Sequence, residues 1–174
     1  MKRNIVRTIC FATLFLALPA VAPAQGHRAC SNAGLAGAWG YTETGTVISP
    51  ATGAAILAAA VGIYTFDHAG KFSGTQNSSA GGKVSLDTKL GTYTVNADCT
   101  ATLTLGVYDK SGTTLLRKSV WEIVLVENAT RMRGIMTSLV VVAGLPAETP
   151  VPPILTMNAQ RLSPGGRGKE QHEQ

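Results

Sequence analysis

The sequence predicts an all-β domain, an antiparallel up-and-down barrel of about eight strands, with a two-sheet β-sandwich as the alternative. Thr, Val, Tyr and Ile recur with period-two alternation, which is typical of strands that bury one face. Groups of Gly, Asn and Asp separate these segments, and no segment shows a convincing helical pattern. A long meander must close or stack to remove its exposed edges, so a barrel is expected, with side chains or one small ligand inside.

Strands are expected along most of the chain. In the first, Trp39, Tyr41 and Val47 share one face. In the longest, Trp121 lies on one face and Glu122 on the other. Residues 54–60 fit either a helical turn or the start of a strand, because so short an apolar run does not separate the two. The expected strands span residues 38–48, 61–66, 71–76, 84–86, 91–95, 100–107, 115–127, 131–142 and 154–161, with a loop at 77–82.

A secretory signal peptide is expected at residues 1–24. Three cations precede a short apolar run, and Ala22-Pro23-Ala24 forms a small-residue cleavage site before Gln25. The apolar run is shorter than the roughly 20 residues that a spanning helix needs. We therefore expect cleavage near Ala24/Gln25 and a periplasmic or secreted protein without a membrane span. An uncleaved N-terminal anchor is the alternative.

The mature chain is expected to form one domain. Cleavage would lower the net charge from +5 to +2, because the leader carries three cations and no acid. No Lys/Arg cluster remains in the middle of the chain, so nucleic acid is not expected as a partner. The predicted division is an N-terminal segment at 25–35, a barrel domain at 36–162 and a disordered polar tail at 163–174. The sequence leaves the oligomeric state open.

Two cysteines, Cys30 and Cys99, follow the leader. An even count in an oxidising compartment predicts one disulfide, which would close a loop of about 70 residues. The alternatives are two free thiols or a metal pair, and two cysteines without nearby histidine make a poor zinc site. Neither a phosphate-binding loop nor a cofactor motif occurs in the sequence, so no metal and no cofactor are expected.

Two segments of the sequence are similar to each other and carry a family resemblance. Residues 62–67 (GIYTFD) and 91–96 (GTYTVN) both run a G-x-Y-T strand into a turn. The longer segments 62–75 (GIYTFDHAGKFSGT) and 91–102 (GTYTVNADCTAT), together with Gly37-Ala38-Trp39, resemble secreted bacterial proteins of unknown function that look like calycin-type or lipocalin-like barrels. The resemblance covers residues 30–162. It implies that Trp39 closes one end of the barrel and that Arg161 packs over it in a cation–π contact. It implies no catalytic residues.

Candidate catalytic groups are few. Glu122 and Glu43 each lie on an expected strand. A carboxylate on the inner face would have a raised pKa and could act as a general acid or anchor a ligand, whereas on the outer face it would be an ordinary surface charge. His68 lies in a turn beside Asp67 and is interpreted as a solvated loop residue. Because the domain holds one histidine and no G-x-S-x-G motif, it gives little support to a catalytic triad.

These observations favour a binding protein over an enzyme. The expected function is that of an exported barrel that binds a small apolar ligand or docks on a cell-envelope partner. The apolar runs 54–63 and 139–145 would form such a site if they lay at the barrel mouth. Two alternatives stay open. One is a barrel enzyme of the allene oxide cyclase-like type, with Glu43 or Glu122 facing a cavity, and the other is a structural or adhesive barrel with a filled core.

Overall fold

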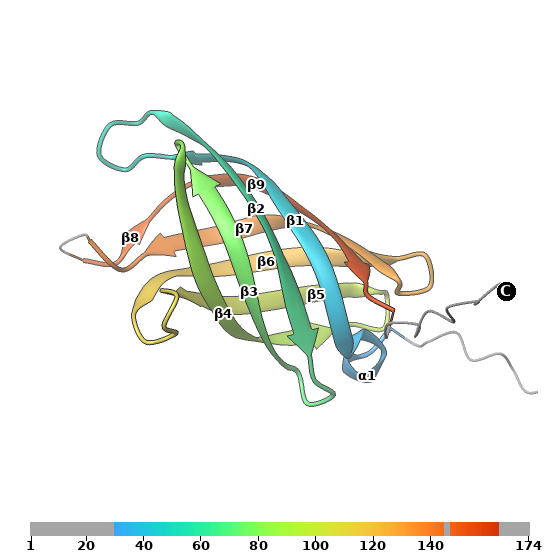
Figure 1. Cartoon of the computed structure of the whole chain (residues 1–174). Helices are drawn as coiled ribbons and strands as arrows, with labels where there is room; N and C mark the ends of the chain where they lie inside the picture. Colours follow the sequence, from blue (N-terminus) through green and yellow to red (C-terminus); the bar gives the residue numbers. More distant parts are fainter. Residues whose placement is uncertain (1–29, 145–146, 164–174) are drawn as a thin grey trace, which may run out of the picture.

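The protein is a closed, all-antiparallel β-barrel in the computed structural model, which describes residues 30–144 and 147–163 (Figure 1). The expected leader at 1–24 and nearly all of the expected tail lie outside the described residues. Closure results from the pairing of β6 with β7 and of β9 with both β1 and β7. The elements are α1 (Asn32–Leu35), β1 (Gly37–Ile48), β2 (Ala55–Phe66), β3 (Lys71–Ala80), β4 (Lys83–Val95), β5 (Thr100–Tyr108), β6 (Leu115–Val126), β7 (Arg131–Val141), β8 (Thr149–Pro150) and β9 (Pro153–Arg161).

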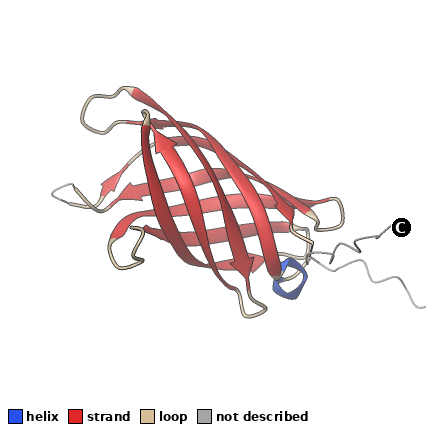
Figure 2. Cartoon of the chain, viewed as in Figure 1, coloured by secondary structure: helices blue, strands red, loops and turns tan. Residues whose placement is uncertain are grey.

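The barrel confirms the predicted fold class and excludes the sandwich. Eight long strands form the wall, and the two-residue β8 pairs only with β7 among the described strands (Figure 2). Each wall strand pairs with its neighbour in the chain except at β7 and β9, which flank β8. No helix in the described part of the chain is long and apolar enough to cross a membrane.

Of the two alternatives for residues 54–60, a helical turn or the start of a strand, the structure shows the strand, which begins at Ala55. Two other segments differ from the sequence expectation. The expected loop at 77–82 is mostly strand, because β3 continues to Ala80. Two short strands were expected where β4 runs without a break. The polar residues in this region stay in strands because the interior gives them partners; the hydroxyl of Ser78, for example, bonds to Asp87 inside the barrel.

The two ends of the barrel differ. The strand β1 begins at the end that carries α1, so the connections at 67–70, 96–99 and 127–130 lie there too. We call this the closed end. The connections β1–β2, β3–β4, β5–β6 and β7–β9 lie at the opposite end, which we call the open end.

The closed end is plugged by α1 and two side chains from β1 and β9. Trp39 is fully buried, and its indole nitrogen donates to the Leu35 carbonyl at 2.9 Å. The guanidinium of Arg161 lies 4.7 Å from the Trp39 ring, in a cation–π contact, and donates to the carbonyls of Ala36 and Gly34. The structure thus places Trp39 and Arg161 together at one end, as the resemblance implies.

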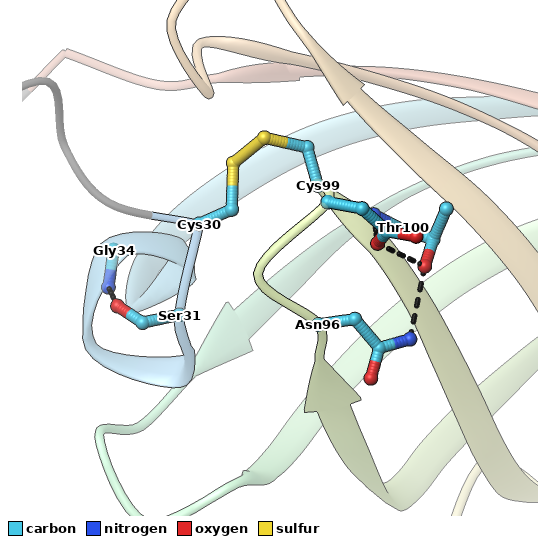
Figure 3. The surroundings of a disulfide bond; sticks show 7 residues. Cys30, Ser31, Gly34, Asn96, Cys99 and Thr100 are labelled. Atoms are coloured by element: carbon cyan, nitrogen blue, oxygen red, sulfur yellow. Dashed lines mark hydrogen bonds between the residues drawn. A yellow bond between two sulfur atoms is a disulfide. The ribbon is translucent and has the colours of Figure 1, made fainter.

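A disulfide joins Cys30 to Cys99 and confirms the predicted pairing (Figure 3). It ties the segment before α1 to the turn between β4 and β5, across 69 residues. Cys99 has a positive φ of 70°, which the turn 96–99 requires. The side chains of Asn96 and Asp98 hold this turn by hydrogen bonds to Thr100. The disulfide therefore anchors the plug to a rigid corner of the barrel.

Aromatic side chains of one strand lie over glycines of the next. A Cβ at Gly62 would meet the Tyr41 hydroxyl at 2.6 Å, and a Cβ at Gly74 would meet the Tyr64 ring at 2.8 Å. The Phe72 ring lies over Gly91 in the same way. This geometry explains the repeated G-x-Y-T pattern, because in Gly62–Thr65 the glycine receives the ring of the preceding strand and the tyrosine covers the next strand. The interior near the closed end is filled by these rings.

Candidate functional site

A cavity of about 430 Å³ lies at the open end of the barrel. Its volume is within the range of ligand sites, roughly 300–1,000 Å³. The barrel therefore combines a filled closed end with a hollow open end, which disfavours the alternative of a barrel with a filled core. Aliphatic and small side chains of five strands and the β8–β9 connection form most of the wall: Val47, Ile56, Ala58, Ala60, Val107, Met136, Leu139, Val141, Val151 and Leu155.

Small residues on β2 and β3 leave the cavity open. Ala58 and Ala60 point inward on β2, and Ser78 does so on the adjacent β3. Larger side chains at the same level would occupy this space. The apolar run 54–63, for which a place at the mouth was one possibility, contributes Ile56 and Ala58–Ala60 to the cavity lining, whereas Leu57 is 76% exposed.

Glu43 and Lys89 form a buried ion pair at the floor of the cavity. The Lys89 ammonium donates to Oε1 of Glu43 at 2.6 Å and to the Tyr64 hydroxyl at 2.9 Å. The Tyr64 hydroxyl donates to the same Glu43 oxygen at 3.2 Å. Tyr41 stacks on Tyr64 with ring centroids 4.0 Å apart, and Lys89 lies 4.8 Å from the Tyr41 ring. The carboxylate and the ammonium are therefore both paired away from bulk water.

Asp87 and Arg117 form a second ion pair beside the first. Oδ2 of Asp87 accepts hydrogen bonds from Arg117 at 2.7 Å, Gln76 at 2.8 Å and Ser78 at 2.9 Å. Tyr41 donates to the Gln76 side chain at 3.3 Å, which links the two pairs. We call Glu43, Lys89, Asp87 and Arg117 the interior ionic cluster.

Burial and hydrogen bonding change the ionisation of this cluster. Burial lowers the pKa of the Lys89 ammonium, and the nearby Glu43 carboxylate offsets only part of this effect. Burial alone would raise the pKa of Asp87, but hydrogen bonds from Gln76 and the charge of Arg117 hold it below its ordinary value. Burial, followed by the Glu43 charge, raises the pKa of Tyr64 well above its ordinary value. The tyrosine stays protonated at neutral pH and acts as a donor.

The candidate carboxylates of the sequence analysis lie on opposite faces of the wall. Glu43 faces the interior and is 6% exposed. Glu122 lies on the outer face, where it accepts hydrogen bonds from the Thr102 hydroxyl at 2.9 and 3.1 Å. Glu122 therefore does not reach the cavity, because it lies between the inward-facing Trp121 and Ile123. His68 is exposed in its turn. No group of three or more His, Cys, Asp or Glu side chains in the described ranges is arranged to hold a metal ion.

Sequence reasoning missed Asp87, Lys89 and Arg117. The strand β4 alternates charged residues with aliphatic ones, and the usual interpretation puts the aliphatic face inside. The structure has the opposite arrangement: Leu86 and Leu90 are 41% and 43% exposed, whereas Asp87 and Lys89 are 1% and 2% exposed. The signal that could have found these residues is the alternation over residues 83–95. If that segment is one strand, Asp87 and Lys89 lie on the same face.

Comparison with known proteins found one solved structure with a weak likeness to this chain. That structure, described as EF1p2_mFAP2b bound to DFHBI, is similar to this chain with 14% sequence identity and a TM-score of 0.48. The match covers 74% of this chain and 94% of that one. A likeness at this level says nothing of what this protein binds. No family model matches the chain, and no curated protein matches its sequence significantly.

Proposed function

We propose that this protein binds one small ligand with an apolar body in the cavity at the open end. The observation that carries the proposal is the cavity itself, about 430 Å³ in volume and walled mainly by aliphatic side chains. An apolar ligand would remove this wall from water, and each square ångström of apolar surface buried contributes about 25 cal/mol. Met136 adds a flexible side chain that adapts to ligand shape.

We also propose that the protein is a secreted, lipocalin-like binding protein that acts outside the cytoplasm. The Cys30–Cys99 disulfide supports an oxidising compartment. The closed barrel with its Trp39–Arg161 plug supports the likeness to lipocalin-type barrels. Cleavage near Ala24/Gln25 is part of this proposal, and N-terminal sequencing of the protein exported by its host would test it. A mature terminus at Met1 would contradict it.

The test of ligand binding is a fluorescence titration of the purified protein with N-phenyl-1-naphthylamine, a neutral apolar probe. Saturable binding with enhanced emission is expected. The variant Ala60→Phe fills the cavity from β2 and should weaken binding at least tenfold. Ala55→Phe is the matched control, because Ala55 is exposed on the outer face of the same strand and should leave binding unchanged. Absence of binding, or equal binding by both variants, would refute the proposal.

The inward carboxylate favours a second candidate function, acid–base catalysis on an enclosed ligand. Glu43 lines the cavity beside the Tyr64 hydroxyl and the Lys89 ammonium, so a base and two donors converge there. The test compares the mass spectrum of a ligand extracted from the host before and after incubation with fresh protein. Conversion by the native protein and its loss in Glu43→Gln would support catalysis. Recovery of the ligand unchanged would contradict it.

A further inference from the structure

We infer that the ligand carries an anionic oxygen group, a carboxylate, and that Arg117 binds this group at the edge of the cavity floor. The inference rests on the proposed ligand-binding function and names the chemical class of the ligand. It depends on three features of the cavity: the free donors of Arg117, the hydroxyl of Ser119 and the balance of charge.

The guanidinium of Arg117 has more hydrogen-bond donors than its contact with Asp87 uses. It carries five N–H groups, and one hydrogen bond, from Nη2 to Asp87, is formed with the described residues. The side chain lines the cavity and is 30% exposed, whereas Asp87 behind it is 1% exposed. The remaining N–H groups are therefore accessible from the cavity. A planar guanidinium binds a carboxylate through two parallel hydrogen bonds.

Asp87 fixes the position of that guanidinium. Gln76 and Ser78 hold the Asp87 carboxylate on β4, and the same Oδ2 atom accepts the hydrogen bond from Nη2 of Arg117. Because the guanidinium is oriented before the ligand enters, less side-chain entropy is lost on binding. Asp87 acts here as a positioning residue.

Ser119 adds a neutral donor next to Arg117. The two residues are two positions apart on β6, so their side chains share the inner face, and both line the cavity. Ser119 is 3% exposed, and its hydroxyl makes no hydrogen bond with any residue that the structure describes. The Ser119 hydroxyl is not one of the fully enclosed, partnerless polar atoms of the described residues, so it remains in contact with the cavity that the side chain lines. A carboxylate bound to Arg117 would accept a hydrogen bond from this hydroxyl.

The charges around the cavity favour an anion over a cation. Lys83, Lys89 and Arg117 line it, and Glu43 and the adjacent Asp87 oppose them, which leaves one net positive charge among the described residues. Both carboxylates already accept ion-pair hydrogen bonds, Glu43 from Lys89 and Asp87 from Arg117. A ligand carboxylate would neutralise the remaining charge, whereas a ligand cation would meet carboxylates that are each already paired with a cation.

The experiment is competition of decanoate and decanol, ligands with the same chain and different head groups, against bound N-phenyl-1-naphthylamine at pH 7.5. Decanoate should compete at least tenfold more tightly than decanol, because a hydrogen bond to a charged group is stronger than one to a neutral group. In Arg117→Gln this preference should vanish while decanol affinity stays the same. Lys118→Gln is the matched control, since Lys118 points outward and pairs with Glu148.

Two further variants keep the test decisive if Arg117→Gln folds poorly. Ser119→Ala preserves the ion pair and should weaken decanoate about threefold without affecting decanol. Arg117→Lys keeps the charge and should retain part of the preference. Equal affinity of the native protein for decanoate and decanol would overturn this inference and leave the proposed ligand binding intact. If the probe does not bind at all, the proposed ligand-binding function itself would be contradicted.

Discussion

The ammonium of Lys89 lies 2.6 Å from the carboxylate of Glu43 inside the barrel, and the two side chains are only 2% and 8% exposed. β1 supplies the carboxylate and β4 the ammonium, with two strands between them in the wall. The pair thus joins opposite parts of the interior below the cavity. Desolvation opposes such a pair, so its contribution to stability depends on both members being present.

Removal of one partner of this ion pair should lower the free energy of unfolding more than removal of both partners. Lys89→Met leaves the Glu43 carboxylate buried without its cation, and we expect a loss of about 3 kcal/mol in the free energy of unfolding. The double variant Lys89→Met/Glu43→Leu should recover more than half of that loss, because it leaves no unpaired charge. Urea denaturation followed by circular dichroism measures both. Additive losses in the double variant would contradict the coupling.

Acid should destabilise the protein partly through Asp87. Its pKa in the folded state is below the ordinary value of 3.8, so the carboxylate stabilises the fold at higher pH. This contribution is lost as the pH falls below about 3.8 and through the folded-state pKa, where Asp87 becomes protonated. In Asp87→Asn, the unfolding free energy should therefore fall less steeply with acid.

Other carboxylates also contribute to the loss of stability in acid. Asp98 and Asp109 also have lowered pKa values, from hydrogen bonds within exposed turns, and they keep their share of the acid response in Asp87→Asn. The native protein is the reference, because Asp98 and Asp109 contribute in the same way to its acid response and to that of Asp87→Asn. Denaturant titrations between pH 2 and pH 6 would show the difference. Parallel curves for the native protein and Asp87→Asn would contradict the role of Asp87.

A methyl group at Gly74 should destabilise the barrel. A Cβ there would lie 2.4 Å from the Ile63 carbonyl oxygen and 2.8 Å from the Tyr64 ring, so the backbone of β2 would have to shift. We expect Gly74→Ala to lower the unfolding free energy by about 2 kcal/mol. Ser73→Ala, on the outer face of the same strand, should change it by less than about 0.5 kcal/mol. A neutral Gly74→Ala would show that β2 and β3 have more room than the structure describes.

Much of the fold follows from local patterns. In β1 and β6 the side chains alternate between the two faces, so Trp39 was correctly predicted to share a face with Tyr41 and Val47, and Trp121 with Ile123 and Leu125. The single disulfide followed from the cysteine count. These features depend on residues close in sequence or on simple pairing, which is why one sequence suffices to predict them.

The interior ionic cluster depends on barrel closure instead. Lys89 and Glu43 are 46 residues apart, and Arg117 and Asp87 are 30 apart. Their pairing requires the register of several strands, which local alternation does not specify. The alternation of β4 was also inconclusive on its own, because charged residues are usually expected outside. Once the barrel is closed, Asp87 and Lys89 lie inside because each forms an ion pair there, while Leu86 and Leu90 face outward.

The interior ionic cluster also has an evolutionary consequence. It separates the aromatic residues stacked over glycines, which fill the closed end, from the small side chains such as Ala58 and Ala60 that bound the cavity. Substitutions on the cavity side change the shape of the space without entering the packed region, and those on the other side act on folding. Because Tyr64 and Tyr41 hydrogen-bond to Glu43 and Gln76 of the cavity lining, the two layers are coupled at the cluster, and the ligand preference can change most freely at Ala58 and Ala60, away from those contacts.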